Sequence, residues 1–215
     1  SFKPVAVLKG KVMRTAQGSF LRKSLVVFQF VSSVVLISGL VIVYQQLQFM
    51  RNQDLGIDIN QTLVIKGPGV VVDSLFRQNI EGLKTEALRI PGVKSMTASS
   101  NVPGDEIFWA SGIRRLSGDN DNSISGYTVG IDHDYVKSFN LNVVAGINFD
   151  LDHPNERGNV ILNEAMAVAL NFKNPNEAIG EKVNQNGDTL EIVGVLENYH
   201  QMSLKEVVTP LVYHY

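Results

Sequence analysis

Residues 25–47 read LVVFQFVSSVVLISGLVIVYQQL, and this segment decides how the rest of the chain is organised. Its first 20 residues, from Leu25 to Tyr44, carry no charge. A helix rises about 1.5 Å per residue, so a run of this length covers the ~30 Å hydrocarbon layer of a bilayer. A buried helix of a soluble protein is rarely apolar for so long, and a signal peptide has a shorter apolar core of ~7–15 residues before its cleavage site. The segment therefore predicts a membrane-spanning helix.

The charges on the two sides of this segment differ sharply. Residues 1–53 contain seven of the 19 bases and no acid, whereas residues 54–215 contain the other 12 bases and all 21 acids. Six bases precede the span, and Arg51 is the one base just after it. Positive residues accumulate on the cytoplasmic side of membrane helices, so residues 1–24 are predicted to be a cytoplasmic or interfacial basic segment. A basic arm that binds nucleic acid is the alternative, and the adjoining span disfavours it.

Helix-favouring composition continues past the span, through residues 45–53. It stops at Asp54-Leu55-Gly56, where the glycine suits a helix end. Neither Gly nor Pro occurs between Leu40 and Leu55, so nothing in the sequence requires a break. Residues 25–53 are therefore predicted to form a transmembrane helix that continues outside the bilayer as a stalk.

The remainder, residues 54–215, alternates short strand-like and helical segments. Its first part predicts a β-α-β unit: a strand at residues 62–66, a helix at 75–89 capped by Asp73 or Ser74, and a strand at 93–99. The helix has apolar residues at helical spacing, which predicts one buried face. Residues 102–122 are polar and rich in turn formers, so no element is expected there.

The second part of this body predicts more strands than helices. Asn163 is placed to cap a helix, and Asn186-Gly187-Asp188 favours a tight strand reversal. Strands are expected at residues 125–132, 141–145, 160–162 and 189–196, and helical segments at 134–139 and 164–170. The body is therefore predicted to be a mixed α/β domain, and the whole chain to be α+β.

Four stretches contain residue types that could carry chemistry. Asp119-Asn120-Asp121-Asn122-Ser123 resembles the start of a calcium loop but lacks the glycine and glutamate that such a loop needs later, so a solvated turn is favoured. Asp132-His133-Asp134 has no second histidine at ligand spacing, which favours a polar strand end over a metal site. Gly67-Pro68-Gly69 lacks the Gly-Lys-Ser/Thr ending of a phosphate loop. Cysteine is absent, which excludes disulfides, thiolate zinc sites and cysteine nucleophiles.

The fourth stretch, GVLENYHQMSL at residues 194–204, brings Glu197, His200 and Ser203 within seven residues. A nucleophile, a base and an orienting acid could converge there. In an extended strand, however, Glu197 and Tyr199 would face one way and Asn198 and His200 the other. We therefore expect no catalytic residue, cofactor or metal ligand on this chain.

Several segments, in their order along the chain, resemble one known family. The span and stalk resemble the first membrane helix of an FtsX-like permease unit of ABC transporters. The segments VILNEAMAVALNF, AIGEKV, IVGVLENYHQMSL and TPLVYHY resemble successive landmarks of the MacB-type periplasmic core domain. The opening SFKPVAVLKGK resembles the segment that closes the first unit of the two-unit permeases common in Bacteroidetes-like bacteria, which would make this chain the start of the second unit.

The resemblance implies a fold and a role. Residues 54–215 would be a MacB-like periplasmic core domain of two subdomains, with an inserted subdomain at about 103–188 and the C-terminal remainder missing. The chain would sit in the bacterial inner membrane with residues after about 45 in the periplasm. It would transmit ATP-driven movement to that domain for efflux, export, lipoprotein release or cell-envelope work. The stretch GVLENYHQMSL would be a structural return strand and turn.

The implied partners are a separate cytoplasmic ABC ATPase, a dimeric or two-unit permease assembly, a periplasmic adaptor and the lipid bilayer, and no nucleic acid. The chain itself would be no enzyme, since it lacks an ATPase motif. Two other classes remain open at this point: a membrane-anchored extracytoplasmic sensor or ligand-binding module, and an extracytoplasmic enzyme.

Overall fold

A computed structural model describes residues 16–53, 55–67, 74–117, 123–150, 158–202 and 207–215. The chain divides into two units, Ser1–Gln53 and Asp54–Tyr215, which we call the helical unit and the body. The boundaries predicted at residue 24 and at about 103–188 stay predictions. The body contains both helices and strands, which confirms the α+β class.

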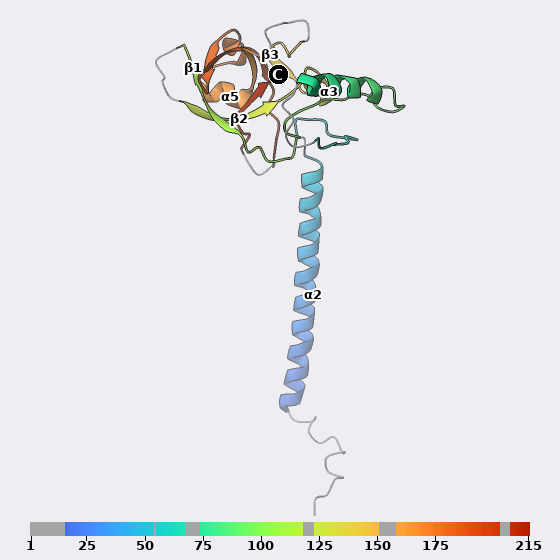
Figure 1. The fold of residues 1–215 in the computed structure, drawn as a ribbon. Helices are drawn as coiled ribbons and strands as arrows, with labels where there is room; N and C mark the ends of the chain where they lie inside the picture. The colour runs from blue at the N-terminus through green and yellow to red at the C-terminus, as the bar shows by residue number, and fades with distance from the viewer. Residues whose placement is uncertain (1–15, 54, 68–73, 118–122, 151–157, 203–206) are drawn as a thin grey trace, which may run out of the picture. The chain divides into compact units, whose positions relative to one another are not determined.

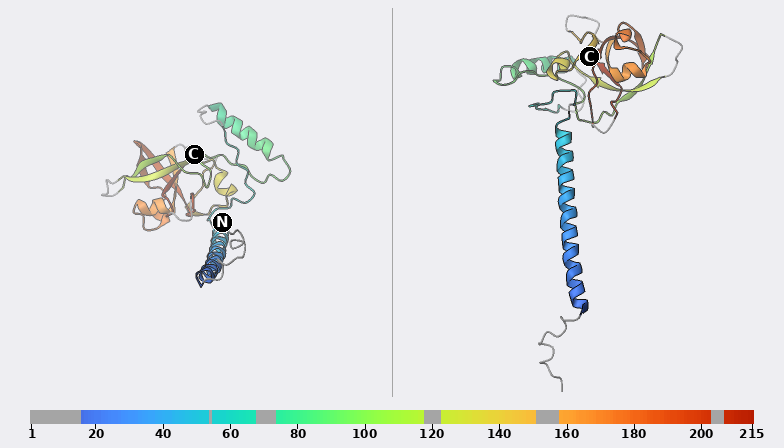
Figure 2. Two further views of the ribbon diagram at one scale, coloured as in Figure 1. Left: turned by 90° about the horizontal axis from the view of Figure 1, so that it is seen from below. Right: turned by 180° about the vertical axis from the view of Figure 1, so that it is seen from behind.

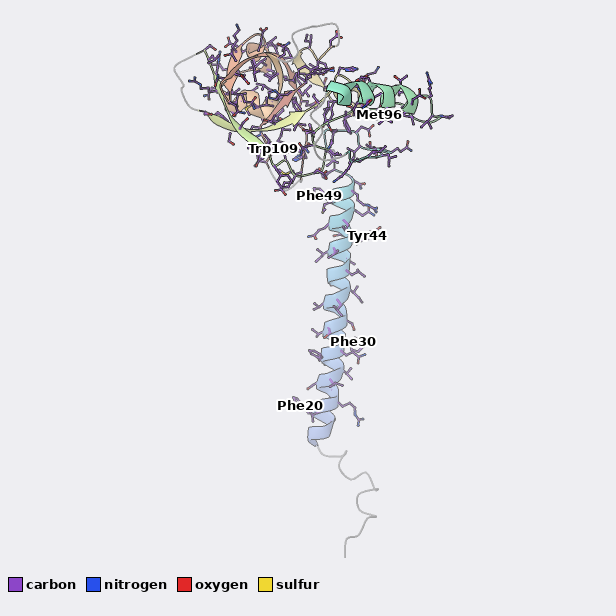
Figure 3. All side chains as sticks on the ribbon, viewed as in Figure 1. Phe20, Phe30, Tyr44, Phe49, Met96 and Trp109 are labelled. Carbon is purple, nitrogen blue, oxygen red and sulfur yellow. The ribbon has the colours of Figure 1, made fainter. Side chains whose placement is uncertain are left out.

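The helical unit is a single helix, α2, from Ala16 to Arg51 (Figure 1). It contains the stretch Ser19–Arg51, which is long and apolar enough to cross a membrane. Apolar side chains lie on all sides of it, and Phe20, Phe30 and Tyr44 project outward at different heights (Figure 3). A helix that is apolar all round needs an apolar environment, which fits lipid. The predicted continuity of span and stalk is confirmed as far as Arg51.

The body is built on seven described strands that form one sheet, in the order β3-β6-β4-β7-β2-β1-β5. Because β5 also pairs with β6, six of these strands close into a small barrel, while β3 pairs with the end of β6. Figure 2 shows the rounded outline of this barrel in the body. The strands are β1 (Ala110–Arg115), β2 (Ile124–Gly130), β3 (Val143–Gly146), β4 (Asn159–Asn163), β5 (Lys182–Gln185), β6 (Asp188–Leu196) and β7 (Leu211–His214).

Two apolar clusters fill the two sides of this sheet, because side chains alternate along each strand. Along β7, Val212 belongs to one cluster, whereas its neighbours Leu211 and Tyr213 belong to the other. The first cluster fills the barrel and is closed by α5 (Glu164–Ala169) and by the 3₁₀ helix η3 (Pro175–Ala178). The second lies outside the barrel under α4 (Tyr135–Ser138) and is reached by Ile57 from the start of the body.

The hairpin between β5 and β6 confirms the predicted reversal at Asn186-Gly187. Both residues have positive φ, 54° and 97°, as a two-residue turn of the type that Asn-Gly favours requires. Gln185 pairs with Asp188 across this turn, so its length sets the register of the β5–β6 ladder.

Asn163 joins three parts of the body, and its predicted cap on α5 is confirmed. Its side-chain oxygen accepts hydrogen bonds from the backbone N–H groups of Met166 and Leu211, both at 2.9 Å, and its amide donates to the Thr209 carbonyl at 2.8 Å. The residue is fully buried, and its bonds to Met166 and Leu211 are buried with it, whereas the bond to Thr209 is partly buried. One side chain therefore holds the start of α5 and the start of β7 together.

Replacing Asn163 with alanine should destabilise the body by about 2–4 kcal/mol, because a cap and two further buried hydrogen bonds are lost together. Asn174→Ala is the matched control: Asn174 caps η3 through the Glu177 N–H at 3.2 Å but is exposed, so about 1 kcal/mol is expected. Urea denaturation of the two variants in detergent measures both values. Equal losses would contradict the assignment of Asn163 as a buried junction.

The predicted β-α-β unit is wrong. A helix is present, α3 from Ser74 to Ala87, but residues 62–66 and 93–98 form no strand, and Ser99 makes only an isolated bridge to Ile131. A strand needs a ladder of hydrogen bonds to a neighbour: among the described residues, the first segment pairs with no strand, and the second meets residues 130–132 only at its end, through Ala98 and Ser100. The expected apolar face of α3 is also not buried in the described part: Leu83 and Leu88 are about half exposed, whereas Lys84 is buried.

Strand β1 lies in a segment where the sequence predicted no element. Its residues ASGIRR have weak strand propensity, and Ile113 is its only buried residue. It forms because β2 and β5 pair with its two edges. Neighbouring backbone thus overrides local propensity here.

Candidate functional site

The candidate site is the place where the chain enters the body, because hydrogen bonds fix the backbone there. The backbone N–H of His200 donates to the Leu55 carbonyl at 3.0 Å, and the N–H of Asp58 donates to the Phe139 carbonyl at 3.0 Å. Ile57, between these two bonds, packs on the outer apolar cluster. We call residues 55–58 with Phe139 and residues 198–200 the entry junction. It fastens the first residues of the body to the end of β6 and to α4.

Gly56 allows this junction to be tight. Its φ is +72°, and an added Cβ would lie 2.8 Å from the Asn198 carbonyl oxygen and 3.2 Å from the Tyr199 Cα. Both neighbours are backbone atoms, which cannot move aside as a flexible side chain could. Glycine is therefore required for two reasons at once, the positive φ and the close approach.

Behind the junction, Tyr199 begins a chain of buried polar groups. Its hydroxyl lies 3.3 Å from that of Tyr135 and donates to the Gln201 side-chain oxygen at 2.8 Å. Gln201 in turn donates to the carbonyls of Val102 and Asp105, at 3.0 and 3.1 Å. Burial raises the pKa of the Tyr135 and Tyr199 phenols above the usual value, so both remain donors at neutral pH. These hydrogen bonds link the entry junction to residues 102–105.

A charged cluster fastens α3 to the end of β2. The Lys84 ammonium lies 2.7 Å from a carboxylate oxygen of Asp132 and 2.9 Å from one of Asp134, and its side chain is only 5% exposed. The Asp132 carboxylate also accepts from the Thr97 hydroxyl at 2.5 Å and from the Ala98 N–H at 2.6 Å. The cluster thus joins α3, residues 97–98 and the segment after β2 at one point.

The electrostatics of this cluster favour the charged lysine. Burial by itself lowers the pKa of Lys84, but hydrogen bonds to Asp132 and Asp134, and the negative charges of both, outweigh it and raise the pKa above the usual value. Lys84 is therefore a cation at any physiological pH. A buried cation held by two carboxylates gives a directional contact that an apolar surface would not give.

A second polar cluster lies inside the barrel. The Gln185 amide donates to the Ser111 hydroxyl at 2.5 Å and to the Thr128 hydroxyl at 3.0 Å, while its oxygen lies 2.9 Å from the His214 ring nitrogen Nε2. Burial lowers the pKa of His214, which favours the neutral ring. Strands β1, β2, β5 and β7 each contribute one residue, so the cluster ties four strands at this level of the barrel.

The residues singled out in GVLENYHQMSL are not brought together as a triad in the described part. The strand ends at Leu196, so the alternation expected for residues 197–200 is wrong: Glu197 is exposed, whereas Tyr199 is buried. The His200 backbone holds Leu55, and its ring nitrogen Nδ1 is buried and has no hydrogen-bond partner within the described ranges. Ser203 lies outside the described residues.

Of the other candidate stretches, two lie partly outside the described residues and one binds Lys84. Residues 119–122 of the calcium-like stretch, and residues 68 and 69 after Gly67, lie outside the described part of the chain. Asp132 and Asp134 bind Lys84, and His133 contributes its Nε2 at 3.1 Å from an Asp134 carboxylate oxygen. Within the described ranges, no group of three or more His, Cys, Asp or Glu side chains is arranged to hold a metal ion.

Sequence reasoning missed the partners of Asp132 and Asp134 and the role of Gly56. Lys84 is 48 residues before Asp132 along the chain, and no local pattern connects them. The one available signal is a lysine among the apolar residues of an amphipathic helix. A lysine at such a position becomes buried, and a buried cation needs a carboxylate beside it. Gly56 was interpreted as a helix end, although the close approach of Asn198 is what requires it.

Residues 27–214 match the family model of the MacB-like periplasmic core domain. A comparison with curated proteins found no match.

Three of the solved structures that resemble the chain are transporter or permease domains. A permease domain from Porphyromonas gingivalis is 13% identical, with a TM-score of 0.41 over 59% of this chain and 52% of that one. The periplasmic region of MacB from Actinobacillus actinomycetemcomitans is 16% identical, with a TM-score of 0.43 over 62% and 53%. The extracellular domain of the noncanonic ABC-type transporter YknZ from Gram-positive bacteria is 22% identical, with a TM-score of 0.44 over 64% and 60%.

The alignments cover between 52% and 60% of the length of these solved chains. The family match, by contrast, extends over nearly all of the present chain, from within the apolar helix to the last strand. It therefore carries the assignment by itself. The chain, an apolar helix followed by an α+β body, belongs to the MacB-like periplasmic core domain family, whose domains occur in permeases of ABC transporters.

Proposed function

We propose that this chain is part of an ABC transporter permease and transmits ATP-driven conformational change across the inner membrane to its periplasmic body. The observation that carries the proposal is helix α2. It is one uninterrupted helix from Ala16 to Arg51, so it includes the whole uncharged run and continues seven residues beyond Tyr44. Movement imposed on such a rod at one end is passed to the other end, because a helix without a kink resists bending, and the part after Leu40 contains neither Gly nor Pro.

The entry junction supports the same proposal. A moving helix can displace a domain only if the first residues of that domain are fixed to its core. Residues 55–58 are fixed in this way, by two backbone hydrogen bonds and by the packing of Ile57 on the outer cluster. A passive anchor would not require so tight an entry, with backbone within 3.2 Å of the missing Cβ of Gly56.

In this proposal, a partner protein carries out all of the chemistry. ATP hydrolysis would occur on a separate cytoplasmic ATPase, and the present chain would hold no catalytic centre, metal or cofactor. The absence of a phosphate-loop sequence supports this division. The basic residues before the span support a cytoplasmic N-terminal segment, which would put the body on the periplasmic side. Export, efflux and lipoprotein or cell-envelope work are the outputs proposed, with a dimeric or two-unit permease and a periplasmic adaptor as further partners.

The proposed orientation predicts which sites an external reagent reaches. In full-length protein in spheroplasts, a tag after Lys11 should stay protected from an external protease, whereas a cleavage site introduced between Asp119 and Ser123 should be cut. The physical reason is the charge asymmetry about the span.

Detergent lysis is the control, since both sites should then be cut. Protection of the body with access to the tag would overturn the orientation. Access to both sites in intact spheroplasts would overturn the span. Transmission itself requires a separate test, a break inside α2.

A further inference from the structure

Two adjacent aromatic side chains stand out on the surface of the body. Phe108 is 80% exposed and Trp109 is 77% exposed, whereas the residue before them, Ile107, is 3% exposed. Trp109 is labelled in Figure 3. Of the Phe and Trp side chains of the body whose exposure the structure describes, these two are exposed, whereas Phe139, Phe149 and Phe172 are buried. Exposing two neighbouring aromatic rings to water is unfavourable, so an environment that accepts them is expected.

The backbone under these rings is held in place. The Trp109 carbonyl accepts from the Thr128 N–H at 3.0 Å, and β1 begins at the next residue, Ala110. Ile107 anchors the other side in the outer apolar cluster. The two rings are therefore presented outward by a fixed strand end, and they cannot turn inward without breaking these contacts.

Hydrogen bonds connect this strand end to the place where the chain enters the body. Gln201 receives the Gly104 N–H on its backbone carbonyl at 2.7 Å and donates its amide to the Asp105 carbonyl at 3.1 Å. His200, the residue before Gln201, holds Leu55. Trp109 is four residues after Asp105, at most about 14 Å further along the chain. The rings thus belong to the region of the body that surrounds the entry junction.

The chain itself limits how far that region can be from the bilayer. Only residues 52–54 separate the last helical residue, Arg51, from Leu55. From Tyr44 to Arg51 the helix rises about 10 Å, which is comparable with the depth of the headgroup layer. A surface tethered so closely meets lipid headgroups at a high effective concentration.

We propose that Phe108 and Trp109 insert into the headgroup interface of the phospholipid bilayer that α2 spans, and thereby form a second membrane contact of the body. Aromatic rings, and Trp above all, favour this interface because it accepts an apolar ring and a polar N–H together. Asp105 is ion-paired with Lys66 at 3.5 Å, and Glu106 is exposed, so the insertion is shallow and leaves these carboxylates in water. The inference rests on the proposed span.

Trp109 is the only tryptophan of the chain, so its fluorescence reports this contact directly. The chain is reconstituted in nanodiscs of a phosphatidylethanolamine and phosphatidylglycerol mixture, with or without bromine on the upper acyl chains. Brominated lipid should quench Trp109, by at least about half of the loss shown by a tryptophan placed in the span. That positive control is Trp109→Phe with Tyr44→Trp.

A negative control uses Trp109→Phe with Val168→Trp, because Val168 is 69% exposed on α5 and belongs to a different part of the body. Quenching of Trp109 and of the span control, without quenching at position 168, supports the proposal. Quenching of the span control alone overturns the second contact and leaves the span intact. If neither the span control nor Trp109 is quenched, the proposed span falls too. Equal quenching at 168 overturns the specific contact.

Discussion

Replacing Lys84 with methionine is expected to destabilise the body by about 3 kcal/mol. The substitution keeps most of the length of the side chain but leaves Asp132 and Asp134 without the cation that binds both. Breaking one partner of a buried ion pair costs about 3–5 kcal/mol, and the lower end applies because Asp134 is 38% exposed. Urea denaturation in detergent, followed by the fluorescence of Trp109, measures the loss.

Two further variants make this test specific. Arg89→Met breaks the exposed pair between Arg89 and Glu86, whose side chains are 70% and 67% exposed, so a change below about 0.5 kcal/mol is expected. Lys84→Met combined with Asp132→Asn removes the unbalanced buried charge and should recover part of the loss. A Lys84→Met variant as stable as the wild type would show that water, and not the lysine, balances the two carboxylates.

The direction of the Lys84 pKa shift determines how the contribution of this lysine to stability depends on pH. The folded-state pKa of Lys84 is raised above its value in the unfolded chain, about 10.4. A cation with a raised pKa stabilises the folded state fully below the unfolded value, and the contribution is lost only as the pH rises through the folded value. The lysine proton should therefore contribute a constant amount to the difference in unfolding free energy between wild type and Lys84→Met from about pH 6 to pH 9.

A proline at position 48 should uncouple ATP hydrolysis from the periplasmic output. Gln48 lies in the part of α2 beyond Tyr44, and a proline there breaks the helix at a cost of about 3 kcal/mol. The body should remain folded and the ATPase bound, because neither contains the substitution. ATPase activity, complex assembly and cellular output are measured in the same variant, and only the output should fall to the level of a strain without the permease.

Gln48→Ala is the matched control for this break. The Gln48 amide donates to the Tyr44 hydroxyl at 3.1 Å, and alanine removes that exposed contact while keeping the helix. Output at the wild-type level in Gln48→Ala, with loss in Gln48→Pro, assigns the effect to helix continuity. If output survives a confirmed break at position 48, a rigid stalk is not how this protein works, and a passive anchor for a sensor becomes the better hypothesis.

Local rules were sufficient wherever an element depends on neighbours in sequence. The uncharged run and the absence of Gly and Pro after it predicted a helix over residues 25–53, and α2 contains this helix from Leu25 to Arg51, because a membrane helix satisfies its own backbone. The same holds for the Asn163 cap and for the Asn186-Gly187 turn, where a short side chain or a positive φ meets a need a few residues away. The α+β class and the family follow from the order of such local signals.

The tertiary structure alone decided which segments become strands and which polar residues meet. Residues 62–66 have a strand-forming sequence but pair with no strand among the described residues. The sequence ASGIRR has weak strand propensity, yet it becomes β1 between β2 and β5. Lys84 is a buried cation because folding brings Asp132 and Asp134 to it. In each case the stabilising partner is far away in sequence, so its hydrogen bond or charge enters the free energy only when the chain has folded, and no local pattern records it.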